Sequence, residues 1–135
     1  MRISRAKRVN LLVLAVVLAA TFATLGGLFL MRDGSVVYGV LDAAWTAPTT
    51  NTDGSPLTDL ASYRVYYSNT PPPCPDGPFL TVASSTARPT SNQRVSATLA
   101  GLTMGQLYYV AVTAVNLRGA ASSCSITASA RARRP

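Results

Sequence analysis

Residues 99–116, LAGLTMGQLYYVAVTAVN, contain two apolar runs that are separated by a short turn around Gly105. After the turn, apolar side chains recur at every second position from Tyr108 to Ala114. Alternation with a period of two is typical of a β-strand that buries one face. The two adjacent tyrosines therefore point to opposite faces, Tyr108 toward the core and Tyr109 away from it.

The same kind of pattern continues on both sides of this stretch. Short alternating or apolar runs occupy residues 41–46, 63–68, 79–83, 95–99 and 126–130. Turn-forming residues, above all proline, glycine, asparagine and aspartate, separate the runs at residues 48–56, 70–78, 88–92 and 117–122. Many short strands with frequent turns predict an all-β fold, a two-sheet antiparallel sandwich with one modest core.

A different composition precedes residue 32. Residues 1–10 carry four cationic side chains and no acidic one, and residues 11–31 carry no charge. At about 1.5 Å per residue, a helix of this length spans roughly 30 Å, the hydrocarbon thickness of a bilayer. We expect one hydrophobic transmembrane helix over 11–31 after a basic cytoplasmic segment over 1–10. A linker over 32–37, an exported domain over 38–131 and a basic tail over 132–135 follow.

The charges on the two sides of the apolar run predict the topology. Cations lie before the run, whereas Arg32 and Asp33 nearly cancel after it. The positive-inside tendency then places the N-terminus in the cytoplasm and the domain in the periplasm or outside the cell, in a single-pass cell-membrane protein. We favour a retained signal-anchor, because the apolar run is longer than a signal peptide needs. A signal peptide that is cleaved to release a secreted protein and a buried helix of a soluble domain stay open.

The net charge of +7 follows the same division. From residue 32 onward eight arginines stand against five aspartates, and three of these arginines lie in the last five residues. The basic composition therefore reflects membrane topology and the C-terminal tail. Nucleic-acid binding would need a clustered basic stripe with stacking aromatics, so we expect no nucleic-acid partner.

Four motifs follow one another in the exported part. They are Trp45-Thr46-Ala47-Pro48, Tyr63-Arg64-Val65-Tyr66-Tyr67, Leu102-Thr103-Met104-Gly105-Gln106-Leu107-Tyr108 and Ala114-Val115-Asn116. In this order and spacing, the region from about Val36 to Arg131 resembles a fibronectin type III domain. The resemblance implies a seven-stranded, immunoglobulin-like sandwich in which strands A, B and E face C, C′, F and G. Met104 departs from the family, which often has proline before the glycine of this turn.

The resemblance also implies structural roles for particular residues. It assigns Tyr108 to the tyrosine corner, whose hydroxyl bonds to backbone upstream in the chain. It makes Trp45 the central aromatic of the core, together with Tyr63, Val65, Leu102 and Val110. Tyr108 is then a structural residue, and Tyr109 remains free for function.

Residues 32–135 contain no histidine, glutamate or lysine. This composition removes most general bases, most imidazole ligands and every Ser-His-Asp arrangement. Asn51, Asp53 and Asp59 offer oxygen atoms, but their spacing matches no calcium loop. We therefore expect a protein without enzymatic activity, and we predict no metal site and no cofactor.

The two cysteines, Cys74 and Cys124, both lie in the exported part. An oxidising compartment favours a disulfide between them. The topology that the resemblance implies places them toward opposite ends of the sandwich, and a disulfide needs Cα atoms within about 7 Å. Pairing of Cys74 with Cys124 and an unpaired, exposed Cys74 both stay open.

Two surfaces are candidates for binding. Arg64, Tyr66 and Tyr109 are out of phase with the core residues, so they form a predicted contact patch on the outer face of the sheet. A cross-strand aromatic pair that only stabilises the sheet is the simpler interpretation. The second candidate surface is the loop end formed by residues 47–61 and 116–122.

These observations favour a membrane-anchored, extracytoplasmic protein-interaction module with one fibronectin type III-like domain. Its expected partners are the membrane and another envelope or surface protein. Two alternatives stay open. One is a secreted carbohydrate-associated or adhesion module, and the other is a structural subunit of an extracellular assembly with a cleaved signal peptide.

Overall fold

The computed structural model describes residues 37–135. The helix predicted over residues 11–31 and the basic segment over 1–10 lie outside the described residues. Within the described part, no helix has the length and hydrophobicity that crossing a membrane requires.

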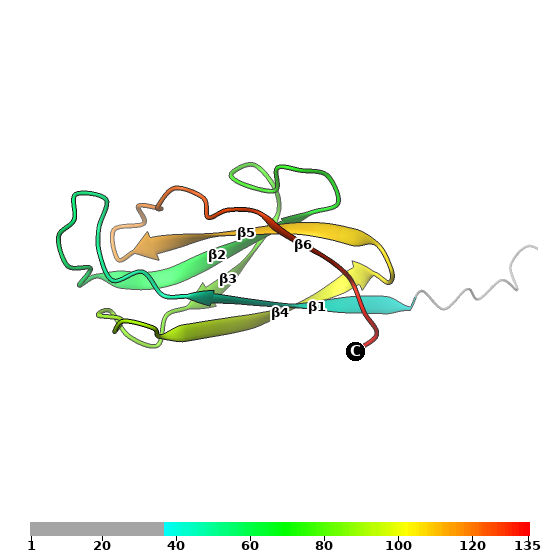
Figure 1. Cartoon of the computed structure of the whole chain (residues 1–135), viewed down its shortest axis with the longest axis horizontal. Coiled ribbons are helices and arrows are strands. Elements are labelled where there is room, and N and C mark those ends of the chain that lie inside the picture. Colours follow the sequence, from blue (N-terminus) through cyan, green and yellow to red (C-terminus); the bar gives the residue numbers. More distant parts are fainter. Residues whose placement is uncertain (1–36) are drawn as a thin grey trace, which may run out of the picture. The chain divides into compact units, whose positions relative to one another are not determined.

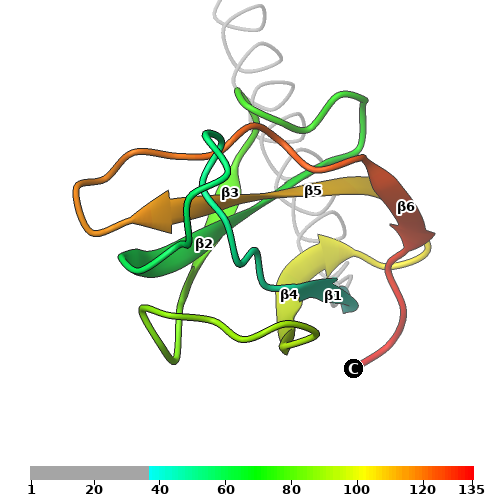
Figure 2. The same cartoon turned by 60° about the vertical axis from the view of Figure 1, so that its left-hand side comes forward.

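Six strands build two antiparallel sheets in residues 37–135 (Figure 1). One sheet pairs β1 with β4, and the other has the order β3-β2-β5-β6. Figure 2 shows the two sheets as separate layers. The strands are β1 Tyr38–Thr46, β2 Leu60–Ser68, β3 Phe79–Ala83, β4 Arg94–Thr103, β5 Leu107–Asn116 and β6 Ala128–Arg131.

The expected seventh strand is missing from the described residues. The strand that carries Trp45 is β1, and it pairs with β4 along most of its length. The family topology places strand A beside this strand, on the edge that faces away from β4. Within residues 37–135 no strand occupies that place, because β1 is the first element of the described chain. Among residues 37–135, the sheet of β1 and β4 therefore has an open edge.

The core lies between the two sheets. Tyr63 and Val65 are 1% and 0% exposed, and Leu102 and Val110 are also buried, as the sequence predicts. Trp45 contacts both of the main core clusters and packs edge-on against Tyr63, with ring centroids 5.2 Å apart. Trp45 is only half-buried, because it also lines a hollow at the surface beside β1.

A loop covers part of the outer face of the four-stranded sheet. Residues 69–78 connect β2 to β3, and within this loop Pro73 is fully buried. Cys74 packs with Tyr66 and Ala111 in a third buried cluster on that face. The loop turns tightly at Gly77, whose N–H donates to the Pro73 carbonyl at 2.9 Å. A Cβ at Gly77 would lie 2.2 Å from the same oxygen, so the turn requires glycine.

Candidate binding groove at the open strand edge

The backbone of β1 presents unpaired hydrogen-bonding groups at its outer edge. Val40 and Arg133 exchange two N–H···O=C bonds of 2.8 Å, so Val40 faces away from β4. The N–H and C=O groups of successive residues point to opposite sides of a strand. The groups of the even-numbered residues after Val40 therefore also face away from β4. Within residues 37–135 these groups have no backbone partner. These outward backbone groups belong to Asp42, Ala44 and Thr46, and we call them the open edge.

A groove of about 390 Å³ lies between the open edge and the opposite sheet. We call it the edge groove. Its lining is mainly apolar: Leu41, Ala43 and Trp45 come from β1, and Val110, Val112, Ile126, Ala128 and Ala130 come from the other side. A neighbouring hollow of about 250 Å³ shares Trp45, Val112 and Ser125 with it. The groove therefore continues toward the loop end of the sandwich.

The segment before β6 forms the far wall of this groove. Ser122 and Ser125 run beside β5 and accept hydrogen bonds through their Oγ atoms, from the N–H groups of Ala114 at 3.0 Å and Val112 at 2.9 Å. Their own N–H groups donate to the carbonyls of the same two residues. Side-chain oxygens thus take the place of a backbone ladder. Ile126 lies in this segment and is 95% exposed at the groove.

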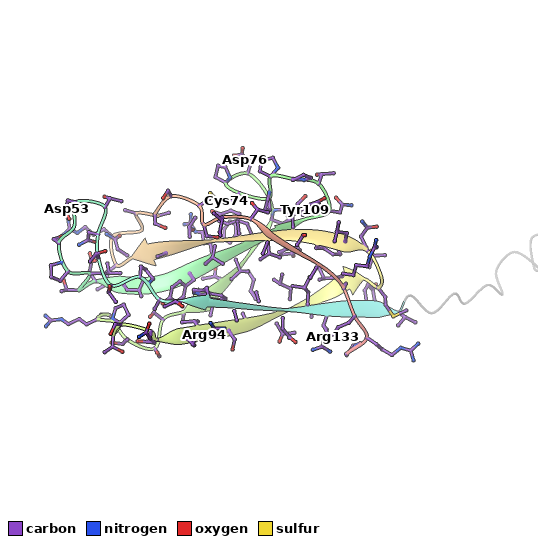
Figure 3. The ribbon with its side chains drawn as sticks, viewed as in Figure 1. Asp53, Cys74, Asp76, Arg94, Tyr109 and Arg133 are labelled. Atoms are coloured by element: carbon purple, nitrogen blue, oxygen red, sulfur yellow. A yellow bond between two sulfur atoms is a disulfide. The ribbon has the colours of Figure 1, made fainter. Side chains whose placement is uncertain are left out.

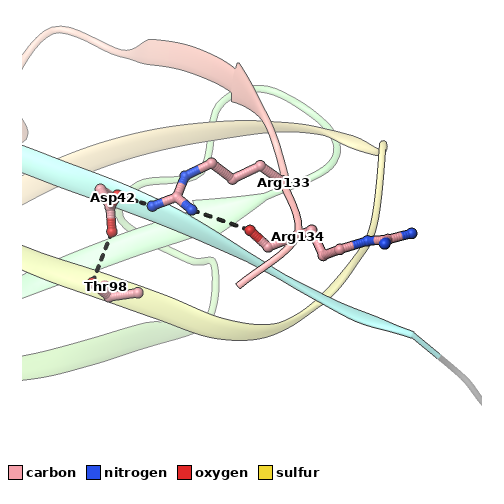
Figure 4. Close-up of polar contacts among 4 residues, drawn as sticks. All are labelled: Asp42, Thr98, Arg133 and Arg134. Atoms are coloured by element: carbon pink, nitrogen blue, oxygen red, sulfur yellow. Dashed lines mark hydrogen bonds and ion pairs between the residues drawn. The ribbon is translucent and has the colours of Figure 1, made fainter.

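The charged groups at the groove are held in a fixed arrangement (Figure 4). The Asp42 carboxylate forms an ion pair with Arg133 and accepts a hydrogen bond from the Thr98 hydroxyl at 2.8 Å. The Arg133 guanidinium also donates to the Arg134 carbonyl at 3.1 Å. Two hydrogen bonds hold the pKa of the Asp42 carboxyl below its usual range. The bond from Arg133 has the larger effect, and the bond from Thr98 has the smaller one.

Cys74 and Cys124 form a disulfide, with Cα atoms 6.2 Å apart (Figure 3). The topology that the resemblance implies places the two cysteines toward opposite ends of the sandwich. They meet because residues 69–78 fold back over the sheet. In addition, β6 begins only at Ala128, so Cys124 lies in the irregular segment that follows β5.

The predicted contact patch is only partly exposed. Tyr66 is 4% exposed, so the prediction that it faces solvent is wrong. The loop over 69–78 covers Tyr66, a long-range contact that alternation cannot reveal. The Arg64 guanidinium lies 5.2 Å from the centre of the Phe79 ring, which in turn packs against Tyr66. Tyr109 is half-buried. Tyr66 and Tyr109 therefore do not form the pair of exposed tyrosines that the sequence predicts on this face.

Tyr108 joins the end of β4 to β5. Its hydroxyl accepts a hydrogen bond from the Thr103 N–H at 3.1 Å, which is the upstream backbone contact that the tyrosine corner implies. The turn between the two strands passes through Gly105, whose φ of 78° suits glycine. The family model for the fibronectin type III domain matches residues 39–129.

The chain belongs to the fibronectin type III family. Its fold is similar to that of the third fibronectin III domain of the human KIAA0343 protein, at 18% sequence identity and a TM-score of 0.46. That match covers 76% of this chain and 81% of the other. No curated protein matches the sequence. Fibronectin type III domains generally mediate contacts between proteins.

The open edge of this fibronectin type III domain was not predicted from the sequence. The signal was present, since residues 38–131 hold six strand-like runs and the family needs seven. The pairing of Arg133 with Val40 had no such signal, because it joins residues at the two ends of the described chain. Chemically, the groove offers backbone donors and acceptors beside apolar side chains, which is what an extended polypeptide recognises.

Proposed function

We propose that this chain is a membrane-anchored protein-interaction module that acts outside the cytoplasm and has no enzymatic activity. The observation that carries the proposal is the open edge of β1 beside the edge groove. An exposed strand edge binds an extended segment by adding it to the sheet, and neighbouring apolar side chains provide selectivity. The partner that fits best is therefore a protein with an accessible strand.

The disulfide supports the compartment. Disulfides persist in oxidising environments and are rare in the cytosol, and Cys74 and Cys124 are paired. The uncharged run over 11–31 behind a cationic segment supports the anchor. Membrane fractionation followed by N-terminal sequencing tests this part. Recovery of a soluble chain that begins after residue 31 would refute the anchor.

The groove also supports a function without catalysis. Among its lining residues, Asp42 is the single carboxylate, and its ion pair with Arg133 keeps it charged. A general acid or base needs a pKa close to the working pH. The hydrogen bond from Arg133 instead lowers the pKa of Asp42, which moves it further from neutral pH.

A photo-crosslinking amino acid tests the binding surface. We would place it at Ile126 in the full chain, in its native membrane, because this side chain is 95% exposed at the groove. The control position is Thr81, which is exposed on β3 at the opposite edge of the four-stranded sheet. We expect a defined protein adduct from position 126 only. Equal adducts from both positions, or none from position 126, would refute the groove as the binding surface.

A further inference from the structure

We propose that the segment bound at the open edge is β1 of a second copy of the same chain. The two β1 strands pair antiparallel about a two-fold axis at Ala44, which joins the sheets of two molecules into one. This inference rests on the proposed function as an interaction module and names its partner.

The arrangement of the open edge is self-complementary. Asp42, Ala44 and Thr46 supply its outward backbone groups, with Ala44 in the middle. Pairing about a two-fold axis at Ala44 places Ala44 opposite its own copy and Asp42 opposite Thr46. In an antiparallel sheet, residues opposed in this way exchange N–H···O=C bonds in both directions. Every outward N–H and C=O group of the open edge then has a hydrogen-bond partner. A two-fold axis at any other residue would leave some of these groups unpaired.

The charges on the exposed face agree with the same register. In β4, Arg94 is the neighbour of Thr46, and Thr98 is the neighbour of Asp42. A pairing that sets Asp42 opposite Thr46 of the second copy therefore brings Asp42 toward Arg94 of that copy. Their Cα atoms would be about two strand spacings, or about 10 Å, apart, which an arginine side chain reaches. The two-fold axis creates this attraction twice.

The apolar side chains near the axis favour a second copy as well. Ile126 lines the same groove as Ala44 and Trp45, and it is 95% exposed. Because these residues lie near the axis, each copy would cover Ile126 of the other. Burial of an isoleucine side chain is favourable, whereas in one molecule alone Ile126 stays in water.

Apart from the charge of Asp42, the edge lacks the devices that usually prevent such pairing. Exposed edge strands usually carry proline, lysine or a bulge that blocks a second strand. The outward residues of β1 include no proline and no lysine, and the bulge between β1 and β4 lies before Leu41, outside the open edge.

Cysteine crosslinking in the full chain, in detergent and in native membranes, tests the pairing. In the proposed dimer the two Ala44 Cα atoms are about 5.5 Å apart, within the range of a disulfide. Ser96 is the matched control, because it is exposed, is the neighbour of Ala44 in β4 and faces the same side of the sheet. Its two copies would lie about 14 Å apart.

We expect Ala44→Cys to give a disulfide-linked dimer on non-reducing gels, at least tenfold more than Ser96→Cys. Peptide mapping checks that Cys74 stays bonded to Cys124. Equal yields from the two variants, or no dimer from Ala44→Cys, would overturn the inference. If the photo-crosslinker at Ile126 captures a different protein while Ala44→Cys gives no dimer, the interaction module stands and the second copy is refuted.

A charge reversal tests the register. Arg94→Asp in the Ala44→Cys background places a like charge beside Asp42 of the second copy, so we expect the dimer yield to fall severalfold at low salt. Arg88→Asp makes the same change of charge in the β3–β4 connection and should leave the yield unchanged. An equal yield with Arg94→Asp would overturn this register.

Discussion

Tyr108 stabilises the junction between two strands through one directional contact. Its ring is half-buried and packs against the core cluster that contains Leu102 and Val110. Its hydroxyl reaches the Thr103 N–H at the end of β4. The adjacent Tyr109 faces the other side of the sheet, and within residues 37–135 its hydroxyl makes no hydrogen bond with the protein. The two tyrosines of the opening sequence therefore contribute differently to stability.

Tyr108→Phe removes the hydroxyl and leaves the Thr103 N–H without its protein partner. We expect a loss of about 1 kcal/mol in the free energy of unfolding, which is typical of one hydrogen bond. Chemical denaturation of the two forms measures it. Tyr109→Phe is the matched control and should leave the midpoint unchanged. Equal midpoints for all three proteins would contradict a stabilising role of the corner.

Asp42 makes the stability of the domain depend on pH. Its pKa is lowered in the folded state by Arg133 and Thr98, whereas an unfolded aspartate titrates near pH 4. A carboxylate with a lowered pKa stabilises the folded state above the unfolded pKa. This contribution is lost as the pH falls through the folded pKa.

Asp42→Asn removes that carboxylate. We expect the variant to melt at a lower temperature than the wild type at pH 6, and the two melting curves to converge as the pH falls well below 4. Thermal melts from pH 6 to pH 2 measure the difference. Asp76→Asn, in the exposed part of the 69–78 loop, controls for the loss of one surface charge. A gap between wild type and Asp42→Asn that does not change with pH would contradict this role.

At the scale of elements, the 69–78 loop depends on a covalent bond to stay on the sheet. It contains five prolines and has no regular strand, so its own hydrogen bonds are few. Cys74 bonds to Cys124 across a sequence separation of 50 residues. A crosslink of this length reduces the entropy of the unfolded chain, an effect worth about 4 kcal/mol in the chain-entropy treatment.

Replacement of both cysteines by serine should lower the free energy of unfolding by about 2–4 kcal/mol. It should also loosen the cover over Tyr66, so amide exchange in residues 69–78 should accelerate. Denaturation and hydrogen exchange with mass spectrometry measure the two effects. The wild type treated with reductant is the control, and it should follow the variant. An unchanged midpoint after reduction would contradict a stabilising disulfide.

The strands could be predicted from the sequence, because alternation of side chains is a local pattern. The 69–78 loop that covers the outer face could not be predicted in this way. Alternation from Tyr108 to Ala114 reports which side chains face the core, because neighbouring side chains point to opposite faces. It cannot report what lies on the outer face. Tyr66 has the position of an exposed residue and is buried by a loop that a distant cysteine holds in place. Such contacts depend on the path of the chain in space.

At the scale of the whole sandwich, the C-terminal residues join the two sheets on the open side. The chain leaves β6 and crosses to β1, as Figures 1 and 2 both show. Ala132 is 3% exposed and exchanges hydrogen bonds with the turn at Gly105 and Gln106. Arg133 then pairs with Val40 and binds Asp42. Residues 132 and 133 were predicted from the sequence to lie in a basic tail. They are instead packed and hydrogen-bonded against the two sheets.

A stop codon after Arg131 tests this junction. It removes the contacts of Ala132 and Arg133, and with each backbone hydrogen bond worth about 1 kcal/mol, the loss of stability should be roughly 2–4 kcal/mol. A stop after Arg133 is the control, since it keeps the bonds to Val40 and Gly105. The longer deletion also frees Val40 and lengthens the open edge, so crosslinking through Ala44→Cys should stay the same or rise. Equal denaturation midpoints for the two truncated proteins would show that the C-terminal residues do not hold the sheets together.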